Sequence, residues 1–368
     1  MNLTISRASL LRLCQRCASV ADKKATIPVL ANLLLTATDD AVNVAATDMY
    51  QLVTDSAPAE VSTPGSIALP AKELAARVAA MPDGNVQLTL KDHTVTLKSV
   101  GSSRKFTLRC VPASEFPALP EPADGGPFLN VHPDALSRLI GLVKVSISAD
   151  ETRPHVNSAL FEWNKDQLRM VSTDGHRLSK AEANVDNETP ATMLIPLRSV
   201  TEIAKLVKDT KDVVTMRPGK THLFLTAGSA RFGVKLVEAQ FPPYEQIIPK
   251  KSERTLTVSR AALCGALQAV KLAADARTAA VRLTHAGDVL RVAAASADAG
   301  NADDEVACEA TGASGEMTIG VNANYLVEAL SALTCDNVTL SMSAELDPVV
   351  LRAVGDDGYL AVVMPMKV

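Results

Sequence analysis

Aromatic residues are scarce in this chain of 368 residues, where Phe, Trp and Tyr together make up 3%. Hydrophobic residues as a whole reach 47%. The core must therefore be built from Ala, Val, Leu and Ile, and few rings remain on which nucleic-acid bases could stack. Neither sign of charge predominates, since 37 Lys and Arg stand against 41 Asp and Glu. A uniformly basic nucleic-acid binder is excluded, whereas a basic face balanced by an acidic one is not.

Long apolar runs and a cysteine framework are also lacking. No run approaches the roughly 18 uninterrupted apolar residues of a membrane-spanning helix. Residues 1–17 carry three arginines where a signal peptide would be apolar, which predicts a cytoplasmic protein. The six cysteines include one close pair, Cys14 and Cys17, within a helical pattern. Both are expected in the core, and neither a metal nor a cofactor is predicted.

Signatures of catalysis are missing as well. The sequence contains no Gly-x-Ser-x-Gly, no His-Glu-x-x-His and no twin Cys-x-x-Cys. Pro218–Thr221 resembles the end of a phosphate-binding loop, but Val214 replaces the required glycine, so a hairpin turn is expected. Asp174 and His176 could serve acid–base chemistry. Because the related segment 47–50 keeps only its Thr-Asp pair, a turn that lines a pocket is favoured over a catalytic one.

One internal spacing dominates the chain. The segment Leu3–Leu10 returns as Leu129–Leu136 and as Leu256–Leu263, with offsets of 126 and 127 residues, and Phe106 matches Phe232 at 126. A period of this length is that of a whole domain rather than of a solenoid unit. The sequence therefore predicts three tandem copies of one domain.

The domain boundaries are expected where the composition turns polar and rich in turn-forming residues, at Pro120–Pro127 and Pro249–Arg254. The predicted domains are residues 1–125, 126–252 and 253–368. Each copy reads as a short strand, a helix, several strands, a second helix and further strands. This order predicts an α+β fold in which two helices cover one face of an antiparallel sheet.

Cationic residues recur at equivalent helix positions. Arg12 and Arg138, 126 residues apart, are expected to point away from the apolar stripe of the first helix in two copies. Lys72 and Arg198 are equivalent on the second helix, and Lys205 shares the face of Arg198. Because the positions repeat, a functional basic face is favoured over an ordinary solvated helix surface.

The two ends of the chain differ in charge. The first copy carries cations beside an aromatic residue, and the third carries an acidic cluster without a nearby run of Lys or Arg. Such an arrangement suggests head-to-tail association of two chains. The residues concerned are Arg104, Lys105 and Phe106 at one end and Asp298, Asp303, Asp304 and Glu305 at the other.

Five segments together resemble one family, the bacterial sliding clamps, which are the beta subunits of DNA polymerase III. They are Thr26–Leu35, Ala46–Asp48, Thr173–Leu178, the Phe-Pro-x-Tyr run Phe241–Tyr244, and Val362–Met366. The resemblance covers essentially the whole chain and is specific in combination.

The resemblance implies a DNA-clamp fold and a homodimeric ring of six domains that encircles duplex DNA. It implies a non-catalytic processivity factor that tethers the replicative polymerase, the clamp loader and repair proteins through short peptide motifs. Twelve helices, each about 10 Å wide, would form a circle roughly 38 Å across and leave about 28 Å clear, enough for a hydrated duplex. A clamp paralogue with altered partners, for example one that confers tolerance to an inhibitor, stays open as the alternative.

The resemblance also implies three groups of site residues. The peptide pocket would consist of Arg153, Val156, Thr173, Gly175, His176, Arg177, Leu178, Pro242, Gln246, Ile247, Pro348, Val362, Val363, Met364, Pro365 and Met366. The DNA-facing residues would be Arg12, Lys24, Lys72, Arg138, Arg198 and Lys205, with the loop Ala149–His155. The dimer contact would set Phe106 against Leu272, with Arg104 and Lys105 opposite Asp298, Asp303, Asp304 and Glu305. The chain departs from the family pattern at Glu73, Pro154, His155 and Gln246.

Overall fold

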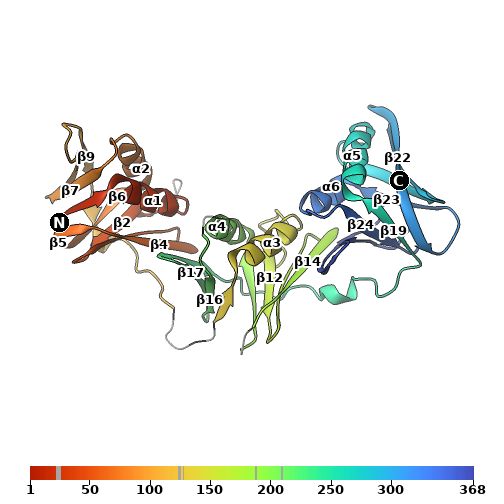
Figure 1. The fold of residues 1–368 in the computed structure, drawn as a ribbon, viewed down its shortest axis with the longest axis horizontal. Helices are drawn as coiled ribbons and strands as arrows, with labels where there is room; N and C mark the ends of the chain where they lie inside the picture. The colour runs from red at the N-terminus through yellow and green to blue at the C-terminus, as the bar shows by residue number, and fades with distance from the viewer. Residues whose placement is uncertain (22–25, 123–125, 127, 187–188, 209) are drawn as a thin grey trace. The chain divides into compact units, whose positions relative to one another are not determined.

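The computed structural model describes residues 1–21, 26–122, 126, 128–186, 189–208 and 210–368 (Figure 1). Contacts within the chain separate two compact units. Unit 1 comprises Met1–Pro133 and Lys205–Leu236, and unit 2 comprises Asp134–Ala204 and Val237–Val368. The predicted boundary at residue 125 and the predicted DNA-facing residue Lys24 lie outside the described residues.

Unit 1 contains two antiparallel sheets and the helices α1 (Arg7–Ala18) and α2 (Ala71–Ala79). The five-stranded sheet has the order β5 (Glu60–Thr63), β1 (Asn2–Ser6), β7 (Asn85–Lys91), β8 (Thr94–Ser99) and β9 (Lys105–Arg109). The nine-stranded sheet has the order β10 (Val111–Pro112), β6 (Gly65–Pro70), β2 (Asn32–Ala37), β3 (Ala41–Thr47), β4 (Gln51–Pro58), β18 (Ala230–Lys235), β17 (His222–Ala227), β16 (Val214–Pro218) and β11 (Leu129–Val131).

Unit 2 is built on one twelve-stranded antiparallel sheet. Its helices are α3 (Pro133–Lys144), α5 (Arg260–Val270) and α6 (Ala323–Ser331), while α4 (Leu197–Lys208) includes the point at which the two units divide. The strand order is β15 (Ala191–Pro196), β12 (Ser158–Trp163), β13 (Gln167–Thr173), β14 (Arg177–Asn184), β26 (Asp356–Val363), β25 (Val349–Ala353), β24 (Asn337–Met342), β19 (Arg254–Ser259), β22 (Gly300–Gly312), β21 (Val289–Ser296), β20 (Ala280–Ala286) and β23 (Met317–Asn322).

The element order repeats three times along the chain. A strand leads directly into a helix at β1–α1, β11–α3 and β19–α5, and a second helix follows each group of middle strands. The predicted α+β fold with three copies of one domain is confirmed. Pro218–Thr221 forms the predicted hairpin turn between β16 and β17, in which the Gly219 N–H donates to the His222 carbonyl at 2.7 Å.

The first helix begins at a serine cap in repeats one and three. The Ser6 hydroxyl accepts from the N–H of Ser9 at the start of α1, and the Ser259 hydroxyl accepts from Ala262 at the start of α5. The α1 face toward the core buries Leu10, Leu13, Cys14 and Cys17 completely. Burial raises the pKa of the Cys14 thiol to about 12, consistent with a packing role rather than a reactive one.

Two strand pairings join successive repeats in the same register. In unit 1, β18 pairs with β4 and sets Val234 opposite Gln51. In unit 2, β26 pairs with β14 and sets Val363 opposite Arg177. The next residue then donates its backbone N–H back to the neighbouring turn, from Lys235 to Tyr50 at 2.8 Å and from Met364 to His176 at 2.9 Å. We call these the first and second repeat junctions. No helix among the described residues is long and apolar enough to span a membrane.

Candidate functional site

The polar turn between β13 and β14 is held by its own side chains. The Thr173 hydroxyl donates to the Arg177 carbonyl at 2.6 Å and accepts from the Gly175 N–H at 3.1 Å. One carboxylate oxygen of Asp174 accepts from the N–H groups of His176 and Arg177, at 2.9 and 3.0 Å. Gly175 has a φ of 95°, a conformation that favours glycine. Asp174 is engaged in shaping the turn, which favours the pocket-lining interpretation over acid–base catalysis.

The Arg177 guanidinium beside this turn is restrained by three partners. Its Nε donates to Asp174 at 3.0 Å, a terminal nitrogen donates to Glu328 at 2.5 Å, and its central carbon lies 4.6 Å from the ring centre of Tyr325. The same ring stacks on His176, with 6.4 Å between the centres. With its charge matched by two carboxylates, Arg177 is suited to orient a bound group rather than to attract one from a distance.

Tyr325 and Glu328 are site residues that the sequence prediction missed. Both lie on α6, and Glu328 is 151 residues from its partner Arg177. No local motif marks them, and only the register of α6 against the β13–β14 turn brings them together. Burial, with the nearby charge of Asp174, raises the pKa of the Tyr325 hydroxyl, so the ring stays neutral and can stack on the arginine.

The C-terminal segment that follows β26 lies along this turn. Its first residue, Met364, is 38% exposed. Farther on, the Met366 N–H donates to the Gly320 carbonyl on β23 at 2.9 Å. A Cβ atom at Gly320 would lie 2.2 Å from the Met366 oxygen and 2.5 Å from Val368, so only glycine lets the segment approach so closely. The segment therefore presents methionine side chains at an ordered position, and methionine suits an adaptable apolar surface.

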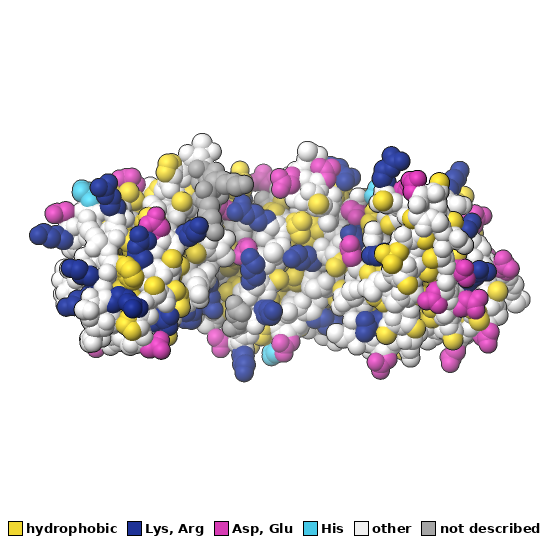
Figure 2. Space-filling model, turned by 90° about the horizontal axis from the view of Figure 1, so that it is seen from above, with side chains coloured by type: hydrophobic (Ala, Val, Ile, Leu, Met, Phe, Trp, Pro, Cys, Tyr) yellow, Lys and Arg dark blue, Asp and Glu magenta, His cyan; other side chains and the backbone are white. Residues whose placement is uncertain are grey.

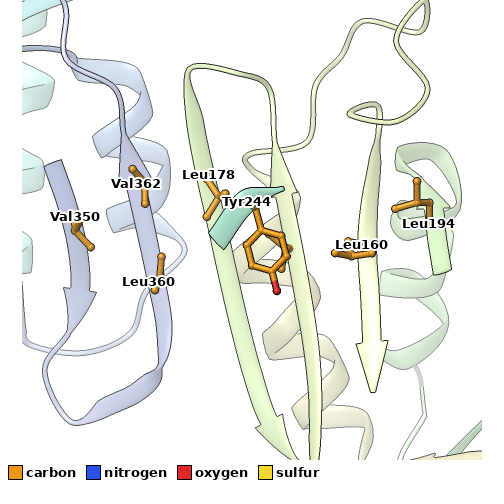
Figure 3. Packing of buried hydrophobic residues seen from close by; sticks show 8 residues of the cluster. Leu160, Leu178, Leu194, Tyr244, Val350, Leu360 and Val362 are labelled. Atoms are coloured by element: carbon orange, nitrogen blue, oxygen red, sulfur yellow. The ribbon is translucent and has the colours of Figure 1, made fainter. Parts of the chain in front are cut away.

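Beneath these residues lies a buried apolar cluster on the sheet of unit 2 (Figure 3). Strands β12 to β15 supply part of it and β25 and β26 the rest, while Tyr244 of the Phe-Pro-x-Tyr segment packs over the sheet. The Tyr244 hydroxyl accepts from Arg169 at 3.0 Å and donates to Glu162 at 3.1 Å. Burial raises the pKa of Tyr244 to about 12. The cluster consists of Leu160, Val171, Leu178, Leu194, Tyr244, Val350, Leu360 and Val362.

The remaining predicted pocket residues all belong to unit 2. Pro348 directly precedes Val349, which pairs with Val363. Pro242, Gln246 and Ile247 flank Tyr244 in the segment that packs over the cluster. The structure thus brings these residues to the β14–β26 pairing, where the Thr173–Arg177 turn and the C-terminal segment also lie.

The loop that holds Arg153 and Val156 is tied to the same strands. The Ser146 and Ser179 hydroxyls are 2.7 Å apart, and Ser179 pairs with Ala361 across β14 and β26. Val156 is buried, whereas Arg153 is exposed and its Nε donates to Asp150 at 2.8 Å. Hydrogen bonds from Thr152 and Arg153 lower the pKa of the Asp150 carboxyl.

The cationic helix residues are placed in two different ways. Arg12 lies off the buried stripe of α1, and its side chain reaches the sheet, where it pairs with Asp55 of β4 and donates to the Ser56 carbonyl. Arg16 also donates to Asp55, at 2.9 Å, and the Asp55 side chain is fully buried. Arg138 likewise turns to the sheet, where it pairs with Asp356 and donates to the Glu182 carbonyl. These guanidiniums anchor helices to strands, and their charge toward solvent is reduced.

Lys72, Arg198 and Lys205 lie on exposed helix positions, as predicted. Figure 2 shows Lys and Arg side chains, with some Asp and Glu, over the first repeat. Over the third repeat, Asp and Glu side chains gather at the right-hand end of the view, with Lys and Arg side chains among them.

The residues predicted at the dimer contact are at the surface. Leu272 is 78% exposed. Arg104 and Lys105 are exposed and Phe106 is half-buried. The four acidic residues of the third repeat are exposed too. Within the acidic cluster, Asp303 pairs with one cation, Arg291 of β21, at 3.1 Å.

Comparison with known families covers the chain in three consecutive segments. Residues 1–120 match the N-terminal domain of the DNA polymerase III beta subunit, residues 130–243 its central domain, and residues 245–367 its C-terminal domain. The beta sliding clamp of Pseudomonas putida is 31% identical over the full length of both chains. That of Escherichia coli is 27% identical, again with complete coverage of both.

Solved structures similar to this chain belong to the same family as its sequence relatives. A DNA polymerase sliding clamp from Pseudomonas aeruginosa superposes with a TM-score of 0.93 at 27% identity and covers all of both chains. The beta subunit of DNA polymerase III from Thermotoga maritima superposes with a TM-score of 0.92 at 26% identity, over all of this chain and 99% of the other.

Proposed function

The chain belongs to the DNA polymerase III beta-subunit family and is a DNA sliding clamp, and from this premise we propose that it encloses duplex DNA as a head-to-tail homodimer and holds partner proteins at one peptide pocket. DNA and a polymerase are the general partners of such a clamp. The proposal assigns no catalytic step to the chain and places it in the cytoplasm. One observation carries it, the strand pairing that repeats at both junctions.

Ring closure follows if the same pairing occurs once more between two chains. The strands that follow the second helix end with β18 in repeat two and β26 in repeat three, and each pairs with the preceding repeat. The corresponding strand of repeat one is β9, which lies at the edge of its sheet. In repeat three, the first part of β22, Gly300–Ala307, is paired with β21 on one side. We infer that β9 of one chain pairs with this part of β22 in its partner.

The side chains at these two edges complement one another. Lys105 on β9 would meet the acidic stretch Asp303–Glu305 of the partner subunit, which would steer the two ends together. Leu272 of the partner subunit would be covered by Phe106. Burying a leucine contributes about 2 kcal/mol, and two such contacts in a closed dimer support a stable ring.

The dimer contact is tested with Leu272→Asp. This variant should run as a monomer in size-exclusion chromatography at micromolar concentration, where the parent runs as a dimer. Leu346→Asp is the matched control, because Leu346 is also exposed, at 64%, but lies outside the proposed contact. A Leu272→Asp protein that remains dimeric would contradict the assignment.

Enclosure of DNA needs little direct affinity. Lys72, Arg198 and Lys205 would meet phosphates without reading base edges, which leaves the ring free to slide. Retention on DNA tests this. Clamps loaded onto closed circular duplex should stay bound in a gel-filtration run and be lost once the DNA is linearised, whereas equal retention on both forms would argue against enclosure.

The peptide pocket would use its parts differently. The methionines of the C-terminal segment and the exposed Ile247 would supply most of the affinity by covering apolar side chains of the peptide, with the buried cluster as their support. The β13–β14 turn would present Arg177 and His176 at the rim, held in place by Tyr325 and Glu328. Because the rim is ordered before binding, little conformational entropy would be lost there.

A further inference from the structure

The first repeat junction carries a cavity of its own. It has a volume of about 330 Å³ and lies beside the turn between β3 and β4, in unit 1. The turn and the start of β4 form one wall, the last residues of the first repeat form another, and β17 contributes one residue. The lining residues are Thr47, Met49, Tyr50, Gln51, Leu52, Ala118, Leu119, Pro120 and His222.

The turn at this cavity has the same internal hydrogen bonds as the turn at the proposed peptide pocket. The Thr47 hydroxyl donates to the Gln51 carbonyl at 2.7 Å and accepts from the Met49 N–H at 3.0 Å. One Asp48 carboxylate oxygen accepts from the N–H groups of Tyr50 and Gln51 at 2.9 and 2.6 Å. Met49 even adopts the left-handed conformation of Gly175, with a φ of 75°. The fold therefore repeats the same hydrogen-bonded turn at both junctions, and the side chains that the turn carries differ.

Large apolar side chains are exposed at this turn. Met49 is 52% exposed and Tyr50 is 64% exposed. A non-glycine residue with positive φ is strained by roughly 1 kcal/mol. The turn keeps Met49 in this conformation, and its side chain extends toward solvent beside the cavity. Methionine and tyrosine are side chains that recur on adaptable binding surfaces.

The nearest cation to the cavity is Lys235, whose Nζ lies 5.8 Å from the centre of the Tyr50 ring. None of the described lining residues carries a carboxylate, while the Asp48 carboxylate lies within the turn and accepts from two of its N–H groups. In the second junction the residue equivalent to Lys235 is Met364. The first junction thus combines an apolar wall with a cation, which complements a segment that carries an apolar side chain next to a carboxylate.

We propose that this cavity is a second docking site, for acidic peptide segments of partner proteins that insert one apolar side chain between Met49 and Leu119 and set a carboxylate against Lys235. A cavity of this size holds one or two side chains, so the segment is short. The inference rests on the proposed function in one respect, namely that partners of the clamp dock through short peptides. The two sites of one chain would then take segments of different charge.

The experiment follows methyl signals of the full-length dimer labelled with ¹³C-methyl methionine. Met49→Leu and Met364→Leu identify the two signals among the 10 methionines. The probe is the peptide acetyl-Asp-Leu-Phe-Asp-Asp-amide, compared with acetyl-Lys-Leu-Phe-Lys-Lys-amide. We expect the acidic peptide to shift the Met49 signal in a saturable way and the basic peptide to bind there at least tenfold more weakly.

Variants assign the effect to the cavity. Lys235→Glu and Tyr50→Ser should each weaken binding of the acidic peptide at the Met49 signal at least tenfold. Lys98→Glu is the matched control, an exposed lysine of the same unit on β8, and should leave it unchanged. A peptide that carries a clamp-binding motif serves as the reference for the Met364 signal.

Several outcomes would overturn the proposal. In the first, the clamp-motif peptide shifts the Met364 signal while the acidic peptide at millimolar concentration does not shift the Met49 signal, and only the second docking site is refuted. The peptide pocket is tested separately: if the clamp-motif peptide does not shift the Met364 signal, that pocket is refuted, whatever the Met49 signal does. Equal shifts by the acidic and basic peptides would refute the assigned chemistry. A Met49 shift that follows protein concentration without peptide would show self-association instead.

Discussion

The two repeat junctions share the same hydrogen-bonded turn and differ in the side chains that the turn carries. Thr47 and Asp48 make the same backbone contacts as Thr173 and Asp174. The residues that follow differ: Met49, Tyr50 and Gln51 in unit 1 stand where Gly175, His176 and Arg177 stand in unit 2. The shared pair is therefore architectural, and the differing residues decide what each junction can bind.

The difference extends to the strand that crosses the junction. In unit 2, β26 leads into a segment that docks at Gly320 and leaves methionines beside the turn. In unit 1, β18 leads through Lys235 into the next part of the chain, and Ala118–Pro120 lie beside the turn instead. The second junction can cover an apolar peptide with its own chain end, whereas the first offers an apolar wall and a cation.

The largest effect is expected from removing the chain end. Truncation after Val363 should weaken binding of a fluorescent clamp-motif peptide at least 100-fold, because the methionines that cover the peptide are lost while β26 keeps its pairing. Fluorescence anisotropy measures the affinity, and size-exclusion chromatography should still find a dimer. Gly320→Ala displaces the same segment without cutting it and should weaken binding about tenfold. Unaltered affinity in both variants would refute the pocket.

The shared framework predicts a loss of stability at each turn, to which Asp174 adds its pairing with Arg177. Asp174→Ala and Asp48→Ala each remove an acceptor of two backbone N–H groups and should each lower the free energy of unfolding by about 2 kcal/mol. Urea titration measures both. Asp166→Ala, at an exposed turn position, should change the free energy by less than about 0.5 kcal/mol. A loss confined to Asp174 would show that the two turns are not equivalent.

Sequence reasoning reached some parts of this structure and not others, for physical reasons. The 126-residue period predicted the order of elements, because repeated apolar stripes and turn signals are local features. The Thr-Asp pair was recognised as structural because two copies could be compared.

Partners brought together across the sheet could not be predicted. Arg12 reaches Asp55, 43 residues away on a strand, and Arg177 reaches Tyr325 and Glu328 on a helix of the next repeat. Such pairs depend on strand register and helix placement, which a single sequence with no alignment does not reveal. The exposed cations Lys72 and Arg198 were placed correctly because helical periodicity alone determines their side of the helix.

The positive φ at the third turn position predicts smaller stability changes of opposite direction for two substitutions, one that adds a side chain there and one that removes it. Gly175→Ala should destabilise unit 2 by about 1 kcal/mol, because a Cβ is strained at a φ of 95°. Met49→Gly should lose little stability or gain up to about 0.5 kcal/mol, since relief of the strain opposes the greater freedom of glycine in the unfolded chain. Urea titration of both variants compares them. Destabilisation by Met49→Gly comparable to that of Gly175→Ala would mean that the Met49 side chain packs against its neighbours. Met49 would then be less free to adapt to a bound peptide.

The smallest effect concerns His222 at the first junction. Burial, and then repulsion by Lys235, lower the pKa of this imidazole in the folded protein. Its neutral form is therefore favoured by folding, so its contribution to stability is present above the ordinary histidine pKa of about 6.5 and is lost as the pH falls below it.

Lys235→Met gives the first junction the residue of the second. The variant should raise the pKa of His222 toward its ordinary value without restoring it fully, because burial remains. An NMR titration of the imidazole Cε1–H signals, assigned with His222→Gln, measures the shift. Lys220→Met, at the neighbouring hairpin turn, is the control and should leave the signal unchanged. An unchanged His222 pKa in Lys235→Met would mean that the lysine charge is screened by solvent at this edge. The two junctions would then differ in their apolar side chains but not in their electrostatics.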